Sequence, residues 1–353
     1  MPFLRPAQAR TALFVRGPRH AALPRLPLHA PSGVGATPLS LFSGCATRLF
    51  SSTPVPCSAP SIVSTQWLKD NLSNVVVVDG SWYPKRRLVD ALAEDALVKT
   101  RDPLSEYLSI HIQDARFFDI DTIADPLASR PRQLPSASEF AAKIGELGIK
   151  PTDHVVVYDT HGIYSSPRVW WTFKVFGHEN VSVLDGGLFK WVSEGNSVTH
   201  GHETFEPATY KATYNPEMVI DHQMLLMYIT DFMFHNQSTI LDARLPTEFS
   251  GRPYHIPGTN IRNGHVPSAV NLPYGSLVQR ESRTLISREQ LQDLFTAKGI
   301  DTRRPFVAMC GNGIVGATLM LVLDILGAKD ARFYPGGWEE WASNKSSPIK
   351  TYA

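Results

Sequence analysis

Cysteine, long hydrophobic runs and a dominant charge are all scarce in this sequence. Only three of the 353 residues are cysteines. No apolar run approaches the roughly 20 residues that a helix needs to span a bilayer, so we expect no membrane segment. Lysine and arginine (34) nearly balance aspartate and glutamate (33), which leaves no basic field to attract nucleic acid. With 43% hydrophobic residues, the composition predicts a globular protein of about two domains, at roughly 150 residues each.

The first sixty residues lack aspartate, glutamate and lysine altogether, although they contain six arginines. An arginine-rich, acid-free N-terminus is typical of an organelle transit peptide. It has no continuous apolar core of the kind that a secretory signal needs. We therefore expect residues 1–58 to direct the protein to mitochondria, with a processing region near "RLFSST" (48–53). A disordered tail without a targeting role is the alternative.

The positions of the three cysteines limit their chemistry. Cys45 and Cys57 lie in the predicted transit peptide, so Cys310 would be the only thiol of the mature protein. A single thiol cannot form an intrachain disulfide, a CxxC redox pair or a cysteine-based zinc site. The sequence also has no metal-ligand cluster and no nucleotide-binding motif. We expect neither a metal nor an organic cofactor.

The rest of the chain repeats one α/β pattern. Apolar strands end in a polar residue or a cysteine at "VVVVDG" (75–80), "HVVVYD" (154–159), "STILDAR" (238–244) and "FVAMCG" (306–311). Each half closes with a Gly-Gly turn before an aromatic helix, at "DGGLFKW" (185–191) and "PGGWEEW" (335–341). Strands that alternate with helices predict an α/β fold with parallel sheets flanked by helices. We expect two such domains, at 59–198 and 221–347, joined by a linker at 199–220.

Cys310 and Asp159 occupy matching positions in the two halves, 151 residues apart, and the same spacing separates Gly313 from Gly162. A carboxylate in place of the cysteine indicates a position that faces solvent or a cleft, and ligands bind at the carboxyl ends of strands in such sheets. The start of a helix also offers unpaired N–H groups and partial positive charge, which lower the pKa of a thiol. We predict a nucleophilic thiolate, with a buried packing cysteine as the alternative. Its anion cradle would be the glycine-rich loop of Gly311, Asn312, Gly313, Ile314 and Val315.

Seven motifs resemble, in order, those of the two-domain rhodanese-type sulfurtransferases. They are "DGSWY" (79–83), "HIQDARFFDID" (111–121), "YSSPRVWW" (164–171), "LDGGLFKW" (184–191), "GHVPSAVNLPY" (264–274), "CGNGIVG" (310–316) and "PGGWEEW" (335–341). The resemblance spans about residues 60–345. It implies tandem rhodanese-like domains, the first inactive and the second carrying the catalytic Cys310. In this family the cysteine takes a sulfane sulfur from a small donor and holds it as a persulfide. It then passes the sulfur to cyanide or to a thiol such as thioredoxin.

The loop "CGNG" (310–313) bears on the choice of donor. Family members that use thiosulfate resemble "CRKG" here, with cations for a dianion, and those that use 3-mercaptopyruvate resemble "CG-S/T-G". The absence of a cation favours 3-mercaptopyruvate over thiosulfate. Asn312 stands where the family has a hydroxyl residue, so a proton relay through that side chain is missing.

The residues expected to bind the donor depart further from the family. 3-Mercaptopyruvate enzymes resemble "RFxG…PEPR", whose two arginines hold the donor carboxylate. Here Glu248 stands at the first arginine position and no "PEPR" follows. Arg252 and Arg262 lie nearby and are candidates to substitute, since arginine pairs with carboxylates; a solvated loop arginine is the alternative for each. Arg168 matches a family residue that faces the interdomain cleft, or it is structural.

Two further residues have both a catalytic and a structural interpretation. His111 matches a family histidine assigned to proton transfer, with Asp102 as a possible orienting partner. The second half repeats this histidine as His265, which favours a structural role in hydrogen bonding to the backbone. Arg244 in "DAR" is expected to support the end of its strand rather than to bind substrate.

Two other functions compete with sulfur transfer. A cysteine phosphatase needs the pattern C-x5-R, but the sixth residue after Cys310 is Gly316, so a phosphate dianion would lack its arginine clamp. A persulfide carrier that delivers sulfur to a protein partner, such as a tRNA-thiolation pathway, would show little turnover of small donors. The altered arginine region keeps this second possibility open. We expect a monomer or a weak dimer.

Overall fold

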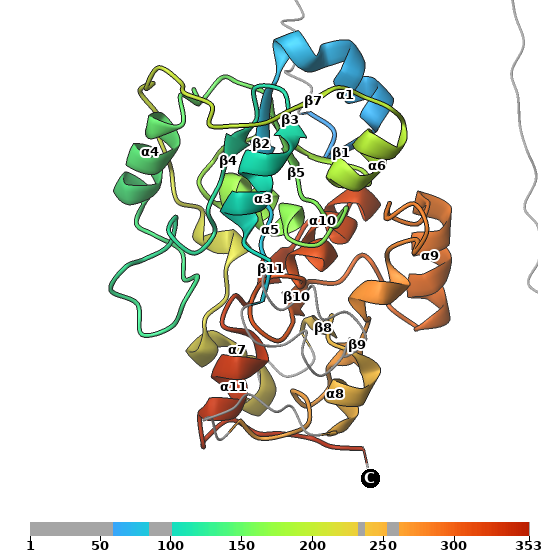
Figure 1. Ribbon diagram of the computed structural model, residues 1–353. Helices are drawn as coiled ribbons and strands as arrows, with labels where there is room; N and C mark the ends of the chain where they lie inside the picture. The colour runs from blue at the N-terminus through green and yellow to red at the C-terminus, as the bar shows by residue number, and fades with distance from the viewer. Residues whose placement is uncertain (1–58, 85–100, 232–236, 253–260, 353) are drawn as a thin grey trace, which may run out of the picture. The chain divides into compact units, whose positions relative to one another are not determined.

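The computed structural model describes residues 59–84, 101–231, 237–252 and 261–352. The predicted transit peptide, with Cys45 and Cys57, lies outside the described residues. Two parallel sheets form the framework (Figure 1). The first has the strand order β1 (Ile62–Val63), β6 (Val181–Leu184), β5 (Val155–Tyr158), β2 (Val76–Asp79) and β4 (Arg116–Phe117). A short antiparallel pair, β3 (His111–Ile112) and β7 (Val198–Thr199), lies beside it.

The second sheet repeats the arrangement of the first without its outermost strand. Its order is β11 (Ala331–Phe333), β10 (Phe306–Met309), β8 (Thr239–Asp242) and β9 (Val270–Asn271), and all of its neighbouring strands are parallel. Strands β5 and β10 are buried at every position, as their continuous apolar sequences predict for the centre of a parallel sheet. The predicted α/β class is therefore confirmed.

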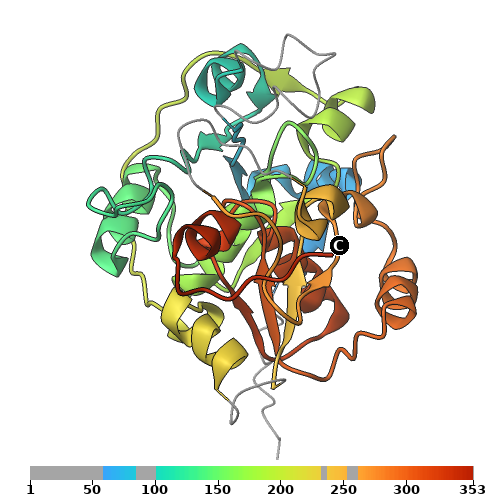
Figure 2. The same ribbon diagram turned by 90° about the horizontal axis from the view of Figure 1, so that it is seen from below.

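The helices repeat as well. In the first half they are α1 (Thr65–Asn71), α3 (Pro103–Ser109), α4 (Ala137–Glu146), α5 (Ser166–Val175) and α6 (Gly187–Ser193). In the second half they are α7 (His222–Thr230), α8 (Pro246–Ser250), α9 (Arg288–Ala297), α10 (Ala317–Leu326) and α11 (Gly337–Ser343). Helices α7 and α11 lie side by side (Figures 1 and 2), where His222 contacts the ring of Trp341. Capping boxes begin both α4 and α9, at Ser136 and Ser287, so even the helix start signals are duplicated.

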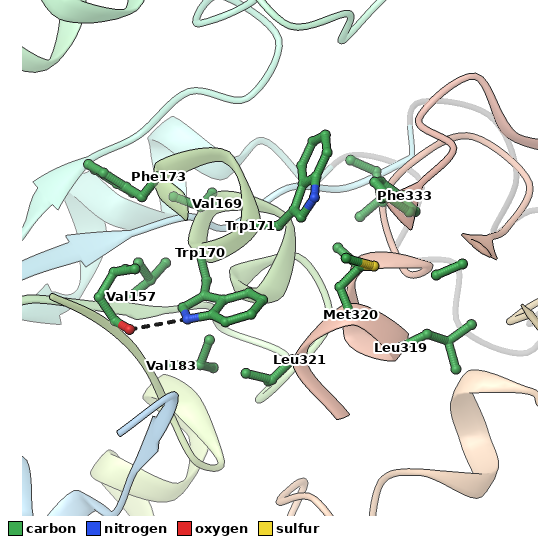
Figure 3. Packing of buried hydrophobic residues seen from close by; sticks show 14 of the residues in the cluster. Val157, Val169, Trp170, Trp171, Phe173, Val183, Leu319, Met320, Leu321 and Phe333 are labelled. Atoms are coloured by element: carbon green, nitrogen blue, oxygen red, sulfur yellow. Dashed lines mark hydrogen bonds between the residues drawn. The ribbon is translucent and has the colours of Figure 1, made fainter. Parts of the chain in front are cut away.

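Helices α5 and α10 join the two halves through one hydrophobic core (Figure 3). Trp171 of α5 meets Phe333 of β11 edge-on, with ring centroids 4.9 Å apart. The neighbouring Trp170 is buried and donates its indole N–H to the Val181 carbonyl at 3.1 Å. Fully buried aromatic side chains dominate core energetics, so the two halves share a core rather than meeting only at a wet surface. Within the described residues, no helix combines the length and apolar character that a membrane span requires.

Candidate active site

Cys310 directly follows β10 and is completely buried. The loop 311–316 then turns into α10, and the backbone N–H groups of Asn312, Gly313 and Gly316 point at the sulfur. Gly313 has φ +79°, a left-handed conformation that favours glycine. Burial raises the pKa of Cys310 above its usual value, and the three N–H groups offset only part of that rise. The prediction of a lowered pKa is therefore wrong for the resting thiol, because burial outweighs the helix N-terminus.

Asp159 occupies the matching cradle in the first half. Its carboxylate accepts backbone N–H groups from His161 (2.9 Å), Tyr164 (2.8 Å), Ser165 (3.0 Å) and Ser166 (2.8 Å), and also the Ser166 hydroxyl at 2.7 Å. Asp159 is only 1% exposed. The prediction that this position faces solvent or a cleft is wrong, because the N–H groups replace water around the charge. The fold thus contains two copies of an anion-binding loop, and the Asp159 carboxylate occupies the first.

The Gly-Gly turns hold both cradles in shape. Gly337 has φ +58°, and a Cβ atom there would lie 2.7 Å from the Cys310 carbonyl oxygen. The next residue, Trp338, donates its N–H to that same oxygen at 2.7 Å. In the first half Gly187 has φ +52°, and Leu188 donates to the Asp159 carbonyl at 3.0 Å. These turns need glycine because the backbone of the cradle leaves no room for a side chain.

Arg168, from the first half, reaches into the cysteine cradle of the second. It is 3% exposed, and it donates Nη1 to the Gly313 carbonyl at 2.8 Å and Nη2 to the Arg132 carbonyl at 2.7 Å. Its guanidinium lies over the Trp171 ring, 4.8 Å from the centroid. Burial and the charge of Arg132 lower the pKa of Arg168 to about 9, and charge on Cys310 opposes that shift. The loop after Cys310 is therefore supported by both halves of the chain.

The comparisons with known proteins agree with this geometry. The model of the rhodanese-like domain matches twice, at residues 64–194 and 230–344. This chain belongs to the family of two-domain rhodanese-type sulfurtransferases. It is 35% identical over 290 residues to 3-mercaptopyruvate sulfurtransferase of Rattus norvegicus, covering 80% of this chain and 91% of the relative. It is 33% identical over 332 residues to the mitochondrial thiosulfate/3-mercaptopyruvate sulfurtransferase 1 of Arabidopsis thaliana, covering 88% and 83%.

A solved structure of the family has the same fold. The crystal structure of SseA from Escherichia coli, described as a 3-mercaptopyruvate sulfotransferase, superposes with a TM-score of 0.68 at 29% identity. The match covers 79% of this chain and 99% of SseA. The predicted tandem rhodanese fold and family are therefore confirmed, whereas the exact domain boundaries and the roles of single residues stay predictions.

The side chains of Arg244 and Arg262 form ion pairs or hydrogen bonds within the second half of the protein. Arg244 forms a buried ion pair with Asp242 at 2.6 Å, donates to the Gly264 carbonyl, and lies 4.2 Å over the Trp338 ring. This agrees with its expected support of the strand end. The Arg262 guanidinium donates to the carbonyls of Ala342, Asn344 and Ser347 at the end of α11. These contacts occupy Arg262 and argue against its predicted role with the donor carboxylate.

Glu248 lies within α8, and Arg252 follows the end of this helix. Glu248 is a half-buried member of the helix, and Arg252 is exposed just beyond it. The Arg252 backbone N–H closes the helix on the Thr247 carbonyl at 3.0 Å. Arg252 therefore remains a surface cation beside the position where the family has an arginine.

His111 has a structural environment. It is fully buried, its Nδ1 lies 2.7 Å from the Tyr107 carbonyl, and its ring stacks on Tyr107 with centroids 4.2 Å apart. Its Nε2 lies 3.3 Å from the Glu203 carboxylate. His265 repeats the arrangement with the Phe249 carbonyl and ring, which supports the structural interpretation of both histidines. The predicted partner Asp102 instead caps α3, where it accepts the Ser105 N–H.

Sequence analysis missed two arginines of the segment before α4. Arg130 pairs with Glu340 of α11. Arg132 lies over Trp82 and near Asp121, with its Nη1 3.5 Å from that carboxylate. The repeat contains a signal for Arg132, because Arg283 lies 151 residues further on, and both have left-handed backbone conformations at φ +62° and +57°. Arg283 lies against the Asp159 loop, where a Cβ atom on Gly162 would meet its backbone oxygen at 2.6 Å. Arg132 contacts the Cys310 loop only through Arg168, which donates to the Arg132 carbonyl.

A cavity of about 410 Å³ lies between the two halves. Its lining comes from the Asp159 loop and from the segment after β9: His161, Tyr164, Tyr274, Gly275, Val278, Gln279, Arg280 and Arg283. Tyr274 donates its backbone N–H to the Ala243 carbonyl at 3.0 Å, and Ala243 donates to Met309, the residue before Cys310, at 2.9 Å. Two backbone hydrogen bonds thus connect the cavity wall to β10, the strand that precedes Cys310.

Two arginines, Arg280 and Arg283, line this cavity. No carboxylate of the described residues lies within ion-pair distance of Arg280 or Arg283. Arg283 lies over the Phe189 ring, 3.9 Å from the centroid. Across the same residues, no group of three or more histidine, cysteine, aspartate or glutamate side chains is placed to bind a metal ion.

Proposed function

We propose that this protein transfers a sulfane sulfur from 3-mercaptopyruvate, or from thiosulfate, to a thiol or to cyanide through a persulfide on Cys310. One observation carries the proposal. The same anion cradle is built twice. The copy in the first half holds the carboxylate of Asp159, and the copy in the second half holds the thiol of Cys310. A cradle that binds a buried carboxylate is suited to the anionic outer sulfur of a persulfide.

The proposed chemistry balances without a cofactor. The Cys310 thiolate attacks the donor sulfur, the C–S bond breaks, and its electron pair stays on the carbon that becomes the methyl group of pyruvate. The proton of the donor S–H moves to that carbon, which leaves an anionic persulfide on Cys310. An acceptor thiolate then attacks the outer sulfur and restores the cysteine. Because burial raises the pKa of the resting thiol, donor binding has to accompany its deprotonation.

Steady-state kinetics test the proposal. We expect turnover of 3-mercaptopyruvate with a dithiol or thioredoxin-type acceptor, a lower kcat/KM for thiosulfate, and no turnover by Cys310→Ser. The absence of turnover with both donors, in a protein that remains folded, would favour the persulfide carrier instead. Hydrolysis of an aryl phosphate would favour the phosphatase.

The two arginines that line the interdomain cavity are our candidates to bind the donor carboxylate. Arg262, Arg244 and Arg168 have their guanidinium groups occupied, whereas Arg280 and Arg283 face the cavity. Replacing Arg283 with glutamine should raise KM for 3-mercaptopyruvate about tenfold, because an arginine–carboxylate pair is lost, with a smaller effect on kcat. Arg303→Gln, at an exposed ion pair with Asp301, is the matched control. Equal KM values for the two variants would contradict this assignment and favour Arg252.

We also propose that the protein acts in mitochondria. The acid-free, arginine-rich N-terminus supports this, and one relative is named as mitochondrial. A fluorescent fusion should lose mitochondrial import when residues 1–58 are deleted. Unchanged targeting of the truncated fusion would contradict the proposal.

A further inference from the structure

Arg168 is a buried cation, and no carboxylate of the described residues forms an ion pair with it. Arg168 is 3% exposed, and both hydrogen bonds of its guanidinium go to backbone carbonyls. Across the described ranges, no carboxylate approaches it within ion-pair distance. The charge of Arg132, a second cation, disfavours the protonated guanidinium of Arg168. An unpaired charge in the protein interior costs several kcal/mol unless an opposite charge is supplied. The site is therefore suited to an anion that is present in only one state of the protein.

Cys310 is the group that can supply this anion. Among the charges acting on Arg168, only that of Cys310 favours the protonated guanidinium. The resting thiol is neutral because it is completely buried. A persulfide is more acidic than a thiol, so the sulfur-loaded cysteine carries a negative charge in the same cradle.

The two halves differ in the residue that supports each cradle. In the first half the cradle holds the permanent carboxylate of Asp159, and the residue 151 positions after Arg168 is Leu319, a buried apolar side chain. In the second half the cradle holds a thiol, and a guanidinium from the first half reaches its loop. The Asp159 cradle thus has a leucine where the Cys310 cradle has Arg168.

We infer that Arg168 is a positioning residue that supplies the buried counter-charge for the Cys310 persulfide across the domain interface. It holds the Gly313 carbonyl, which leaves the loop N–H groups turned toward the sulfur, and its charge favours the loaded over the unloaded cysteine. The catalytically silent first half would then be required for the stability of the intermediate. This inference rests on the proposed persulfide chemistry, but its first test does not.

The first test places a permanent anion in the second cradle. Cys310→Asp reproduces the group found at Asp159, and Cys310→Asn is its neutral isostere. In the full chain we expect the Asp variant to melt at least about 2 °C above the Asn variant when Arg168 is present. In the Arg168→Met background this difference should disappear, because the carboxylate then lacks its counter-charge. If Arg168→Met does not fold, Arg168→Gln, which retains N–H donors for the carbonyls, replaces it.

An Asp–Asn difference that is the same in both backgrounds would overturn the inference, whether or not the protein transfers sulfur. The second test uses the cysteine itself. The pH midpoint of Cys310 alkylation by iodoacetamide should move to higher pH in Arg168→Gln and stay near wild type in Arg168→Lys, which keeps the charge. A merely structural role would not separate these two variants, so an equal midpoint in both would also contradict the inference.

Discussion

At the residue scale, one pair of matching positions explains most of the chemistry. Asp159 and Cys310 follow equivalent strands and lie in equivalent loops, yet one has a carboxylate and the other a thiol, which in our proposal becomes an anion only when it reacts. Four backbone N–H groups neutralise Asp159. The corresponding N–H groups at Cys310 only partly offset the effect of burial on its pKa. The cradle is therefore structural in the first half, and in our proposal it holds the reacting sulfur in the second.

Asp159→Ala should destabilise the protein by about 3 kcal/mol or more, because it leaves several buried N–H groups without an acceptor. Cys310→Ala removes only a neutral thiol, and we expect a loss of about 1 kcal/mol. Urea unfolding monitored by tryptophan fluorescence would measure both. Similar losses for the two variants would contradict the view that only the first cradle holds a permanent anion.

At the element scale, each Gly-Gly turn brings the start of a helix, α6 or α11, into contact with the cradle of Asp159 or Cys310. Gly337→Ala should destabilise the protein by about 2 kcal/mol or more and strongly reduce sulfur transfer, because a Cβ atom would lie 2.7 Å from the carbonyl oxygens of Cys310 and Gly311. Gly195→Ala is the matched control, since Gly195 also has positive φ (+72°) but open space around it. We expect it to cost about 1 kcal/mol of backbone strain and to leave turnover intact. Equal effects on turnover would show that the close approach at Gly337 is unimportant.

The repeated elements were predictable from the sequence because local signals define them. Continuous apolar runs gave the buried strands, and the spacing of 151 residues aligned Cys310 with Asp159. The partners of the arginines were not predictable, because they lie far away in the chain: Arg262 binds carbonyls at 342–347, and Arg168 binds Gly313. The burial of Asp159 was missed for a related reason, since a carboxylate is expected at a surface unless its N–H donors are known in advance.

At the scale of the whole molecule, the two halves depend on one another at their interface. The shared core between α5 and α10 provides apolar contact, and polar contacts cross at specific points. Arg168 supports the second cradle, and Asp185 of the first half accepts the Leu285 N–H of the second at 2.9 Å. A change at this interface should therefore alter both stability and activity.

Burial raises the pKa of Asp185 from 3.8 to about 6. The folded state then binds this proton more tightly than the unfolded chain, so the contribution of Asp185 to stability falls as pH rises from about 4 to about 6 and stays low above that. Asp185→Asn keeps an oxygen for the Leu285 N–H and removes the charge. At pH 7 it should stabilise the protein by about 1 kcal/mol, after allowance for partial exposure to solvent. The advantage should vanish near pH 4; an advantage that does not change with pH would contradict the assignment.

The central claim is that Cys310 carries the transferred sulfur, and intact-protein mass spectrometry tests it most directly. After incubation with 3-mercaptopyruvate and removal of the excess, the wild-type chain should gain the mass of one sulfur atom, on the peptide that contains Cys310. Added cyanide should remove this mass and release one equivalent of thiocyanate, and Cys310→Ser should gain nothing. No mass gain with either 3-mercaptopyruvate or thiosulfate, or the same gain in Cys310→Ser, would contradict the account.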